Sequence, residues 1–287
     1  MIKSVISLFS IITLLYSCQG SAKSNKDVIT VTIEPLKYLT EQVVGDDFDI
    51  NVIVPSGASP ETYEPSPSNM RKFETSKLFI SIGLMECEFD IIKNSKTKNN
   101  IAQIQLKDSI NLIKGSCTAH NHSEHAHSAM DPHIWSSPRD VKTIISMIEK
   151  SASELKPQNK DRYIKNAQNF NQRVDSLDLY IKNKLSEVKQ RYFIIYHPAL
   201  TYYSRDYDLT QIVIENGGKE SSGKHLKEII DSGKNAKSIF YQSQFSKNSV
   251  ESVCKEIGAS AIEINPLAYD WLKNMYIITD SLYNSMK

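Results

Sequence analysis

The amino-acid sequence predicts an α/β protein with two lobes, each a mostly parallel β-sheet flanked by helices, joined by one long rigid α-helix. Short apolar runs alternate with helical stretches in the first part of the chain, and the same alternation returns in the last part. One long amphipathic segment separates the two parts. Alternation of strands and helices is typical of parallel sheets whose crossovers are helical.

The N-terminal lobe is expected over residues 28–154. Its strand-like apolar runs are separated by helical stretches, the first of which ends at Gly45, a residue that commonly follows a last helical turn. The C-terminal lobe is expected over residues 191–287. The predicted strands of the two lobes lie at residues 28–33, 50–54, 78–82, 192–196, 238–241 and 260–264.

A linking helix is expected over residues 155–190. A run of apolar residues there follows spacings of four and three, which places them on one face of a helix. They are Tyr163, Ala167, Phe170, Val174, Leu177, Ile181, Leu185 and Val188. From about Pro157 to Gln190 the helix would be about 50 Å long. A coiled-coil dimer arm is the alternative, but scattered Asn and Gln residues favour a strut packed against both lobes.

The N-terminus is typical of an exported lipoprotein. Lys3 precedes an apolar run at residues 5–16 that is too short to span a bilayer of about 30 Å. The residues up to Cys18 resemble a bacterial lipobox, in which the signal is cut before a cysteine that then carries lipid. We therefore expect a signal peptide with a lipidated cysteine over residues 1–18, a tether over 19–27, and an extracytoplasmic protein anchored to a bacterial membrane. An ordinary signal peptide that happens to contain a cysteine is the alternative.

The overall composition is that of an ordinary folded protein. Charged residues make up 23% of the chain and the net charge is +1, so no nucleic-acid partner is indicated. Beyond Cys18, the remaining cysteines are Cys87, Cys117 and Cys254. Three cysteines allow at most one intramolecular disulfide, and either one bridge or three free thiols is open.

A histidine-rich loop is expected at residues 119–128, where no apolar periodicity is found. Imidazole is a ligand that zinc, copper and nickel favour, and closely spaced imidazoles can reach one cation together. The density of histidine therefore indicates metal affinity rather than a polar loop that merely tolerates the residue. The four histidines are His120, His122, His125 and His127.

A second metal-binding element follows that loop directly, at residues 131–138. Pro132 restrains the chain before His133, and Trp135 lies two residues beyond it. This segment resembles the Asp-Pro-His-x-Trp-x-x-Pro motif of the zinc- and manganese-binding solute-binding proteins of ABC importers. The similarity extends over nearly the whole mature chain, and its other matching segments lie at residues 55–67, 196–203, 239–246 and 265–268.

The resemblance implies a metal ion held in a cleft between the lobes by four side chains. Carried over by position, the ligands are Glu61, His133, His197 and Asn265. The family commonly has histidine at the first of these positions and aspartate at the last. Glutamate remains a competent zinc ligand, whereas the neutral amide of asparagine is a weaker one. Asp270 is the alternative source of the missing charge, and Asn265 would then lie only behind the ligands.

The resemblance implies a monomeric binding protein that captures a divalent transition metal and delivers it to a membrane permease. Two imidazoles and the histidine-rich loop favour Zn²⁺, and the oxygen ligands leave Mn²⁺ possible. A periplasmic zinc hydrolase is the alternative from another class, but no His-Glu-x-x-His helix is present. A third possible function is that of a storage or adhesion lipoprotein that uses only the histidine-rich loop. His225 has no ligand context and is expected at the surface.

Overall fold

The computed structural model describes residues 26–96, 100–115, 130–215, 227–229, 231, 233, 235–245 and 247–287. The predicted signal peptide with Cys18, most of the tether, and the histidine-rich loop lie outside these residues. Cys117 and His225 lie outside them as well. Within the described part of the chain, no helix is both long and apolar enough to cross a membrane.

The N-terminal lobe is a four-stranded parallel sheet with the strand order β2-β1-β3-β4. Val31 of β1 pairs with Val52 of β2 on one side and with Ile80 of β3 on the other. The elements of this lobe are β1 (Val28–Val31), α1 (Glu34–Val44), β2 (Asp49–Val52), α2 (Pro67–Phe73), β3 (Ser76–Ser81), α3 (Glu86–Asn94) and β4 (Ala102–Gln105).

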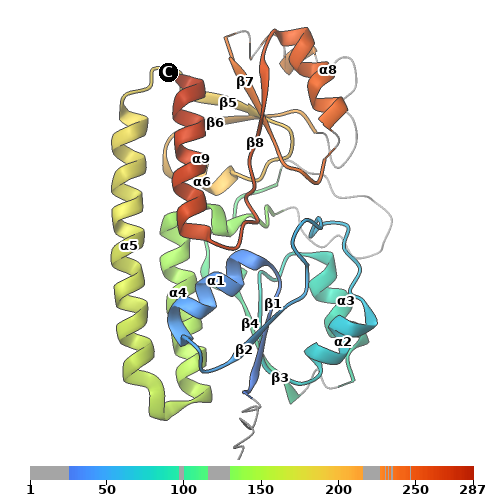
Figure 1. The fold of residues 1–287 in the computed structure, drawn as a ribbon, viewed down its shortest axis with the longest axis vertical. Helices are drawn as coiled ribbons and strands as arrows, with labels where there is room; N and C mark the ends of the chain where they lie inside the picture. The colour runs from blue at the N-terminus through green and yellow to red at the C-terminus, as the bar shows by residue number, and fades with distance from the viewer. Residues whose placement is uncertain are drawn as a thin grey trace, which may run out of the picture.

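The C-terminal lobe repeats this topology, since its four parallel strands have the order β6-β5-β7-β8. The two sheets lie in separate halves of the molecule in Figure 1. The fold class expected from the sequence is therefore confirmed. The elements of this lobe are β5 (Tyr192–Ile195), α6 (Thr201–Asp206), β6 (Thr210–Val213), β7 (Ser238–Tyr241), α8 (Lys247–Ile257), β8 (Ser260–Glu263) and α9 (Trp271–Met286).

The long helix α5 (Lys160–Ser186) runs along both lobes (Figure 1). Its 27 residues correspond to a length of about 40 Å. It ends four residues before the predicted limit at Gln190 and is preceded by a 3-10 turn, η4 (Pro157–Asn159). Seven of the eight apolar residues used to predict it lie on α5 and are buried, and Val188 is buried just beyond its end. They pack towards α1, α4 (Pro138–Leu155) and α9, so one face of the helix is core.

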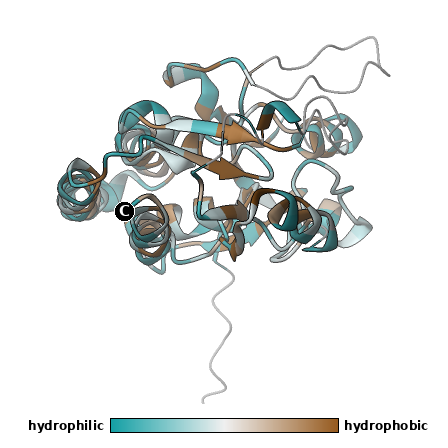
Figure 2. Cartoon of the chain, turned by 90° about the horizontal axis from the view of Figure 1, so that it is seen from above, coloured by the Kyte–Doolittle hydropathy of each residue, from teal (hydrophilic) through white to brown (hydrophobic). Residues whose placement is uncertain are grey.

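The hydrophobic core is continuous from one lobe to the other. One cluster of buried residues includes strands of both sheets together with α4, α5 and α9. A smaller cluster lies between the second sheet and α8. Figure 2 shows the molecule from above, with hydrophobic residues on strands in its interior and both hydrophilic and hydrophobic residues along the helices around them. The lobes are thus joined by packing as well as by the chain.

The two sheets direct the carboxyl ends of their strands towards a shared pocket. The loops after β2, β3, β5, β7 and β8 all contribute residues to its lining. The 3-10 turn η3 (Ile134–Ser136), which precedes α4, contributes from a third direction. Parallel α/β sheets commonly bind ligands at the carboxyl ends of their strands. The fold therefore places a candidate site between the lobes.

Candidate metal centre

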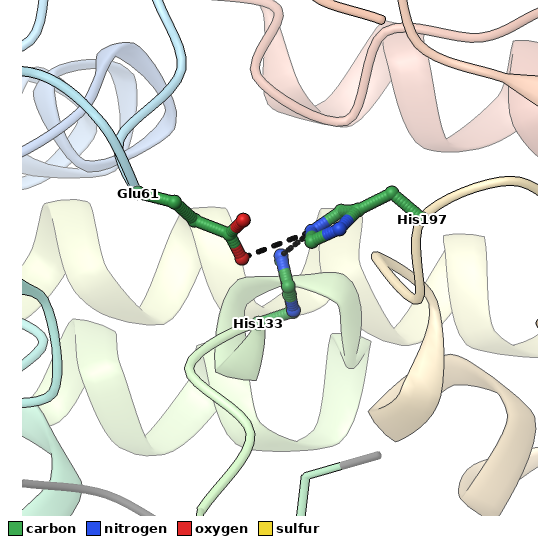
Figure 3. A group of neighbouring side chains, drawn as sticks. All are labelled: Glu61, His133 and His197. Carbon is green, nitrogen blue, oxygen red and sulfur yellow. Dashed lines mark hydrogen bonds and ion pairs between the residues drawn. The ribbon is translucent and has the colours of Figure 1, made fainter. Parts of the chain in front are cut away.

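Three of the four ligands predicted from the sequence converge in this pocket. Glu61 lies in the loop between β2 and α2, His133 directly precedes η3, and His197 follows β5 (Figure 3). One potential ligand atom of each lies within 4.8 Å of the others. Residues 72 and 64 positions apart in the chain are brought together only by the fold, so the convergence is a property of the tertiary structure.

The distances within this group suit a tetrahedral ion. The Nε2 atoms of His133 and His197 are 3.2 Å apart, and Nε2 of His197 lies 3.3 Å from Oε1 of Glu61. Zinc binds nitrogen and oxygen at about 2.0–2.2 Å, so two ligands on one tetrahedral ion are separated by about 3.3–3.5 Å. The donor set therefore fits zinc in spacing as well as in chemistry.

A buried carboxylate holds each imidazole from behind. Nδ1 of His133 lies 2.9 Å from Oδ1 of Asp131, and Nδ1 of His197 lies 2.9 Å from Oε2 of Glu215. Both carboxylate side chains are only 2% exposed. An ionised carboxylate can only accept, so each Nδ1 carries the proton and donates it. Carboxylates commonly orient metal-binding histidines in this way.

This tautomer leaves the Nε2 lone pairs facing one another and Glu61. Two lone pairs and a carboxylate oxygen at such distances repel unless a proton or a metal cation lies among them. The charges of Glu61 and of the two supporting carboxylates add to this preference. The arrangement therefore has the electrostatics of a cation site.

The pKa shifts agree with a site of negative potential. Burial alone would lower the pKa of His197, but its hydrogen bond to Glu215 and the charge of Glu61 outweigh burial and raise it. Burial alone would raise the pKa of Asp131, but the charge and hydrogen bonds of His133 and a hydrogen bond from Thr201 lower it. Both shifts have the same cause, the close pairing of imidazole with carboxylate in a buried place.

The local sequence explains why His133 is fixed. Asp131 accepts the His133 main-chain N–H at 2.8 Å as well as the ring N–H. Its other carboxylate oxygen accepts a hydrogen bond of 2.6 Å from the Thr201 hydroxyl, at the start of α6. The Trp135 ring lies 5.2 Å from the His133 ring. These contacts tie the segment to the C-terminal lobe close to the His133 imidazole.

Exposure differs within the group of three. The side chain of Glu61 is 38% exposed, whereas those of His133 and His197 are 9% and 6% exposed. Phe245 stacks on the His197 ring with the ring centres 5.0 Å apart and shields it from solvent. An ion arriving from solvent therefore meets the glutamate first, and the imidazoles lie deeper.

The fourth predicted ligand has other contacts. Asn265 is exposed, and its Oδ1 accepts the main-chain N–H of Leu267 at 3.1 Å. The following residues, Pro266 and Leu267, line the pocket. Asp270 caps α9 by accepting the N–H of Lys273 at 3.1 Å, and it is not part of the converging group. The role of Asn265 as a ligand stays a prediction.

The two cysteines that the structure describes do not take part in the group. Cys87 and Cys254 are both free and buried, so they form no disulfide with one another. Burial raises the pKa of the Cys87 thiol to about 12, and metals bind the thiolate. This leaves Glu61, His133 and His197 as the one His/Cys/Asp/Glu group in the described residues with metal-binding spacing.

Two residues behind the ligands were not recognised as functional from the sequence. Asp131 belongs to the motif that contains His133, which does not indicate its role, and Glu215 belongs to none of the matching segments. Glu215 follows the edge strand β6, which pairs in parallel with β5, the strand that ends at His197. Recognition of β6 would have predicted the contact, because the ends of paired parallel strands lie side by side.

Two parallel α/β lobes around a shared pocket define the class of two-lobed binding proteins. A family model described as "zinc-uptake complex component A periplasmic" matches residues 29–285, and the chain belongs to this family. The high-affinity zinc uptake system protein ZnuA of Bacillus subtilis is 30% identical over 266 residues, which cover 88% of this chain and 82% of that protein.

Further relatives agree in sequence and in structure. The zinc-binding protein AdcA of Streptococcus pyogenes is 28% identical over 283 residues, which cover 92% of this chain. This chain spans 55% of the length of AdcA, about half of that relative. A crystal structure of ZnuA has 34% identity and a TM-score of 0.84, and the match covers 91% of this chain and all of that one.

Proposed function

We propose that this protein is the extracytoplasmic solute-binding component of an ABC importer, and that it captures zinc between its lobes and delivers it to a membrane permease. The observation that carries the proposal is the convergence of Glu61, His133 and His197 in an interlobe pocket. Membership of a zinc-uptake family and relatives named for zinc binding or zinc uptake support it. Zinc is the cargo in this proposal.

Zinc is favoured over manganese by the chemistry of the donors. Two imidazole nitrogens and one carboxylate oxygen form a common zinc set, and affinity for such ligands rises along the first row from manganese towards copper and zinc. Manganese prefers sites richer in oxygen. We propose Zn²⁺ as the principal cargo, with Mn²⁺ as a weaker competitor.

The remaining parts of the proposal concern location and partners. We propose that lipid on Cys18 anchors the protein to a bacterial membrane and that residues 19–27 act as a tether. The protein would act as a monomer beside its permease. The histidines at residues 119–128 would collect zinc, a role supported by their ligand chemistry.

Zinc binding by single-site variants tests the proposal. Protein purified without a metal-loaded column should hold close to one tightly bound zinc per chain, measured by elemental analysis and chelator competition. His133→Ala and His197→Ala should each lose the tight site. Deletion of residues 119–128 should keep it. A double histidine variant that still binds zinc tightly through the loop would contradict the proposal and favour a protein that uses only the loop.

We propose a binding role rather than hydrolysis. The sequence has no His-Glu-x-x-His helix, and the family is one of transporter binding components. Zinc-loaded protein should therefore leave ester, phosphoester and peptide substrates intact. Turnover that His197→Ala abolishes would contradict this part of the proposal.

A further inference from the structure

Gln242 has an unpaired polar atom in a place where such atoms are costly. It directly follows β7 and is only 3% exposed. Its Oε1 is buried and has no hydrogen-bond partner among the described residues. Four buried side-chain atoms in the described residues have no hydrogen-bond partner. Of these, only Oε1 of Gln242 belongs to a residue that lines the pocket. A buried carbonyl without a donor destabilises the fold unless a ligand or water completes it.

The orientation of this amide is fixed by its neighbour. Nε2 of Gln242 lies 3.1 Å from the main-chain oxygen of His197, which also accepts the N–H of Ala199 at 2.8 Å. A carbonyl can only accept, so the NH₂ group of Gln242 must face it. The amide oxygen is therefore the atom left without a partner, and exchanging the two amide atoms would set two acceptors against one another.

The position of Gln242 relates it to the proposed ligands. β5 and β7 are neighbouring parallel strands, so His197 and Gln242 follow strand ends that lie side by side. Gln242 lines the same pocket as Glu61, His133 and His197. The pocket as a whole has a volume of about 40 Å³, more than the roughly 10–15 Å³ that one water needs. Oε1 itself is covered in this structure, so a small shift of the side chain is needed for a water to reach it.

We infer that the Gln242 carbonyl oxygen accepts a hydrogen bond from a water molecule bound to the captured ion. The inference rests on the proposed function, because the ion supplies the water. Three protein ligands leave one tetrahedral position to water, and bound water is a stronger donor than free water because the ion withdraws its electrons. Gln242 then has two tasks: its NH₂ holds the main chain at His197, and its oxygen holds the water.

This arrangement also limits the charge at the site. An amide oxygen holds the water without adding a second negative charge beside Glu61. Zinc is then bound by the Glu61 carboxylate and two neutral imidazoles. This low ligand charge suits a carrier that must release its cargo. Gln242 is therefore a positioning residue for the bound water.

Three variants separate the two tasks of Gln242. Gln242→Met removes both the donor and the acceptor. The matched control Asn171→Leu removes an amide whose oxygen is also buried and unpaired, but on α5 and outside the pocket lining. Chelator competition should show zinc affinity about 10–100-fold weaker in Gln242→Met, the usual effect of losing a group behind the ligands. Asn171→Leu should stay close to wild type. Gln242→Glu keeps an acceptor and loses the donor, so it should bind zinc more tightly than Gln242→Met.

Two outcomes would overturn the inference. Equal losses in Gln242→Met and Gln242→Glu would assign the effect to the donor that holds His197. Equal zinc affinities in Gln242→Met and Asn171→Leu would show that Gln242 has no role in zinc binding. Circular dichroism of the metal-free variants checks their folding.

A crystal structure of the wild-type protein with zinc tests the inference without any variant. We expect a water within hydrogen-bond distance of Gln242 Oε1 and bound to the ion. A protein atom in that coordination position, or an Oε1 that remains unpaired, would overturn the inference and leave the proposed function intact. Wild-type protein that binds no zinc in the pocket would instead overturn the proposed function.

Discussion

The carboxylates behind the two histidines decide how well the imidazoles can serve as ligands. Glu215 is buried and its Oε2 lies 2.9 Å from Nδ1 of His197, so it fixes both the ring orientation and the tautomer. Its charge also makes Nε2 a better electron donor. Asp131 has the same relation to His133. The zinc affinity of the proposed site should therefore depend on residues that are not themselves proposed ligands.

Glu215→Gln should weaken zinc binding while leaving the three ligands in place. The amide keeps the shape of the side chain but removes the charge, and it can turn its NH₂ towards Nδ1 and so favour the wrong tautomer. We expect an affinity about 10–100-fold lower, measured by chelator competition. Glu256→Gln, at an exposed position of α8, is the matched control and should bind as wild type does. Equal affinities in the two variants would refute the role of Glu215.

At the scale of elements, α5 joins the lobes through one apolar face. Leu177 is fully buried, whereas Leu179 on the same helix is 59% exposed. Leu177→Ala should lower the free energy of unfolding by about 2–5 kcal/mol, because it leaves a cavity in the shared core. Leu179→Ala makes the same chemical change and should stay within about 0.5 kcal/mol of wild type. Urea denaturation of metal-free protein measures both, and similar losses would contradict the assignment of the buried face.

The start of α5 is held by Asp47, in the loop between α1 and β2. Oδ2 of Asp47 accepts hydrogen bonds from Asn159 at 2.8 Å, from the Tyr163 hydroxyl at 2.5 Å and from Arg162. Burial alone would raise the pKa of Asp47, but the hydrogen bonds from Arg162 and Tyr163 outweigh it and lower the pKa below the ordinary value of 3.8. The ionised form is therefore the one that stabilises the folded state.

Asp47→Asn should reduce stability in a pH-dependent way. A carboxylate with a lowered folded-state pKa contributes stability above its unfolded pKa, and this contribution is lost as the pH falls through the folded value. We expect a loss of about 1 kcal/mol near neutral pH for this partly solvated site. The difference from wild type should persist down to about pH 5 and shrink below the unfolded pKa. A difference that grows on acidification would contradict the sign of the shift.

The central strands of the two sheets were easier to predict from the sequence than the edge strands. The central strands β1, β3, β5 and β7 carry apolar runs because they are largely buried, and the sequence predicts all four. Of the four edge strands, the sequence predicts β2 and β8 but not β4 and β6, which contain polar residues. An edge strand needs little apolar surface, so its sequence carries a weaker signal, although not always one too weak to recognise.

The residues of the site also divide into some that the sequence predicts and some that it does not. His133 and His197 lie beside prolines in recognisable segments, so the sequence could suggest them together with Glu61. Glu215 was missed because the strand before it was missed. The free Oε1 of Gln242 could not be predicted, because it depends on which main-chain carbonyl the NH₂ group faces. Hydrogen bonds between distant segments are determined by the tertiary structure.

At the scale of the whole molecule, hydrogen bonds join the His133 segment to the C-terminal lobe. The Trp135 indole donates to the Pro266 carbonyl at 2.9 Å, and the Trp271 indole donates to the Trp135 carbonyl at 2.7 Å. The Tyr202 hydroxyl donates to the Asp131 carbonyl at 2.7 Å. All these donors are buried, and the core continues through α5. The two imidazoles should therefore move as one body.

We expect zinc to close the molecule only slightly. Because the imidazoles are held together and a stiff helix spans both lobes, the part left to adjust is the exposed Glu61 in the loop after β2. Crystal structures of metal-free and zinc-loaded protein should differ by a small rotation of the lobes, with the larger shift at Glu61. Trp271→Phe keeps an aromatic ring and removes the indole N–H, so it should allow a wider opening in metal-free protein, measured by small-angle scattering. A rotation of tens of degrees in the wild-type protein would show that α5 and these hydrogen bonds do not hold the lobes together.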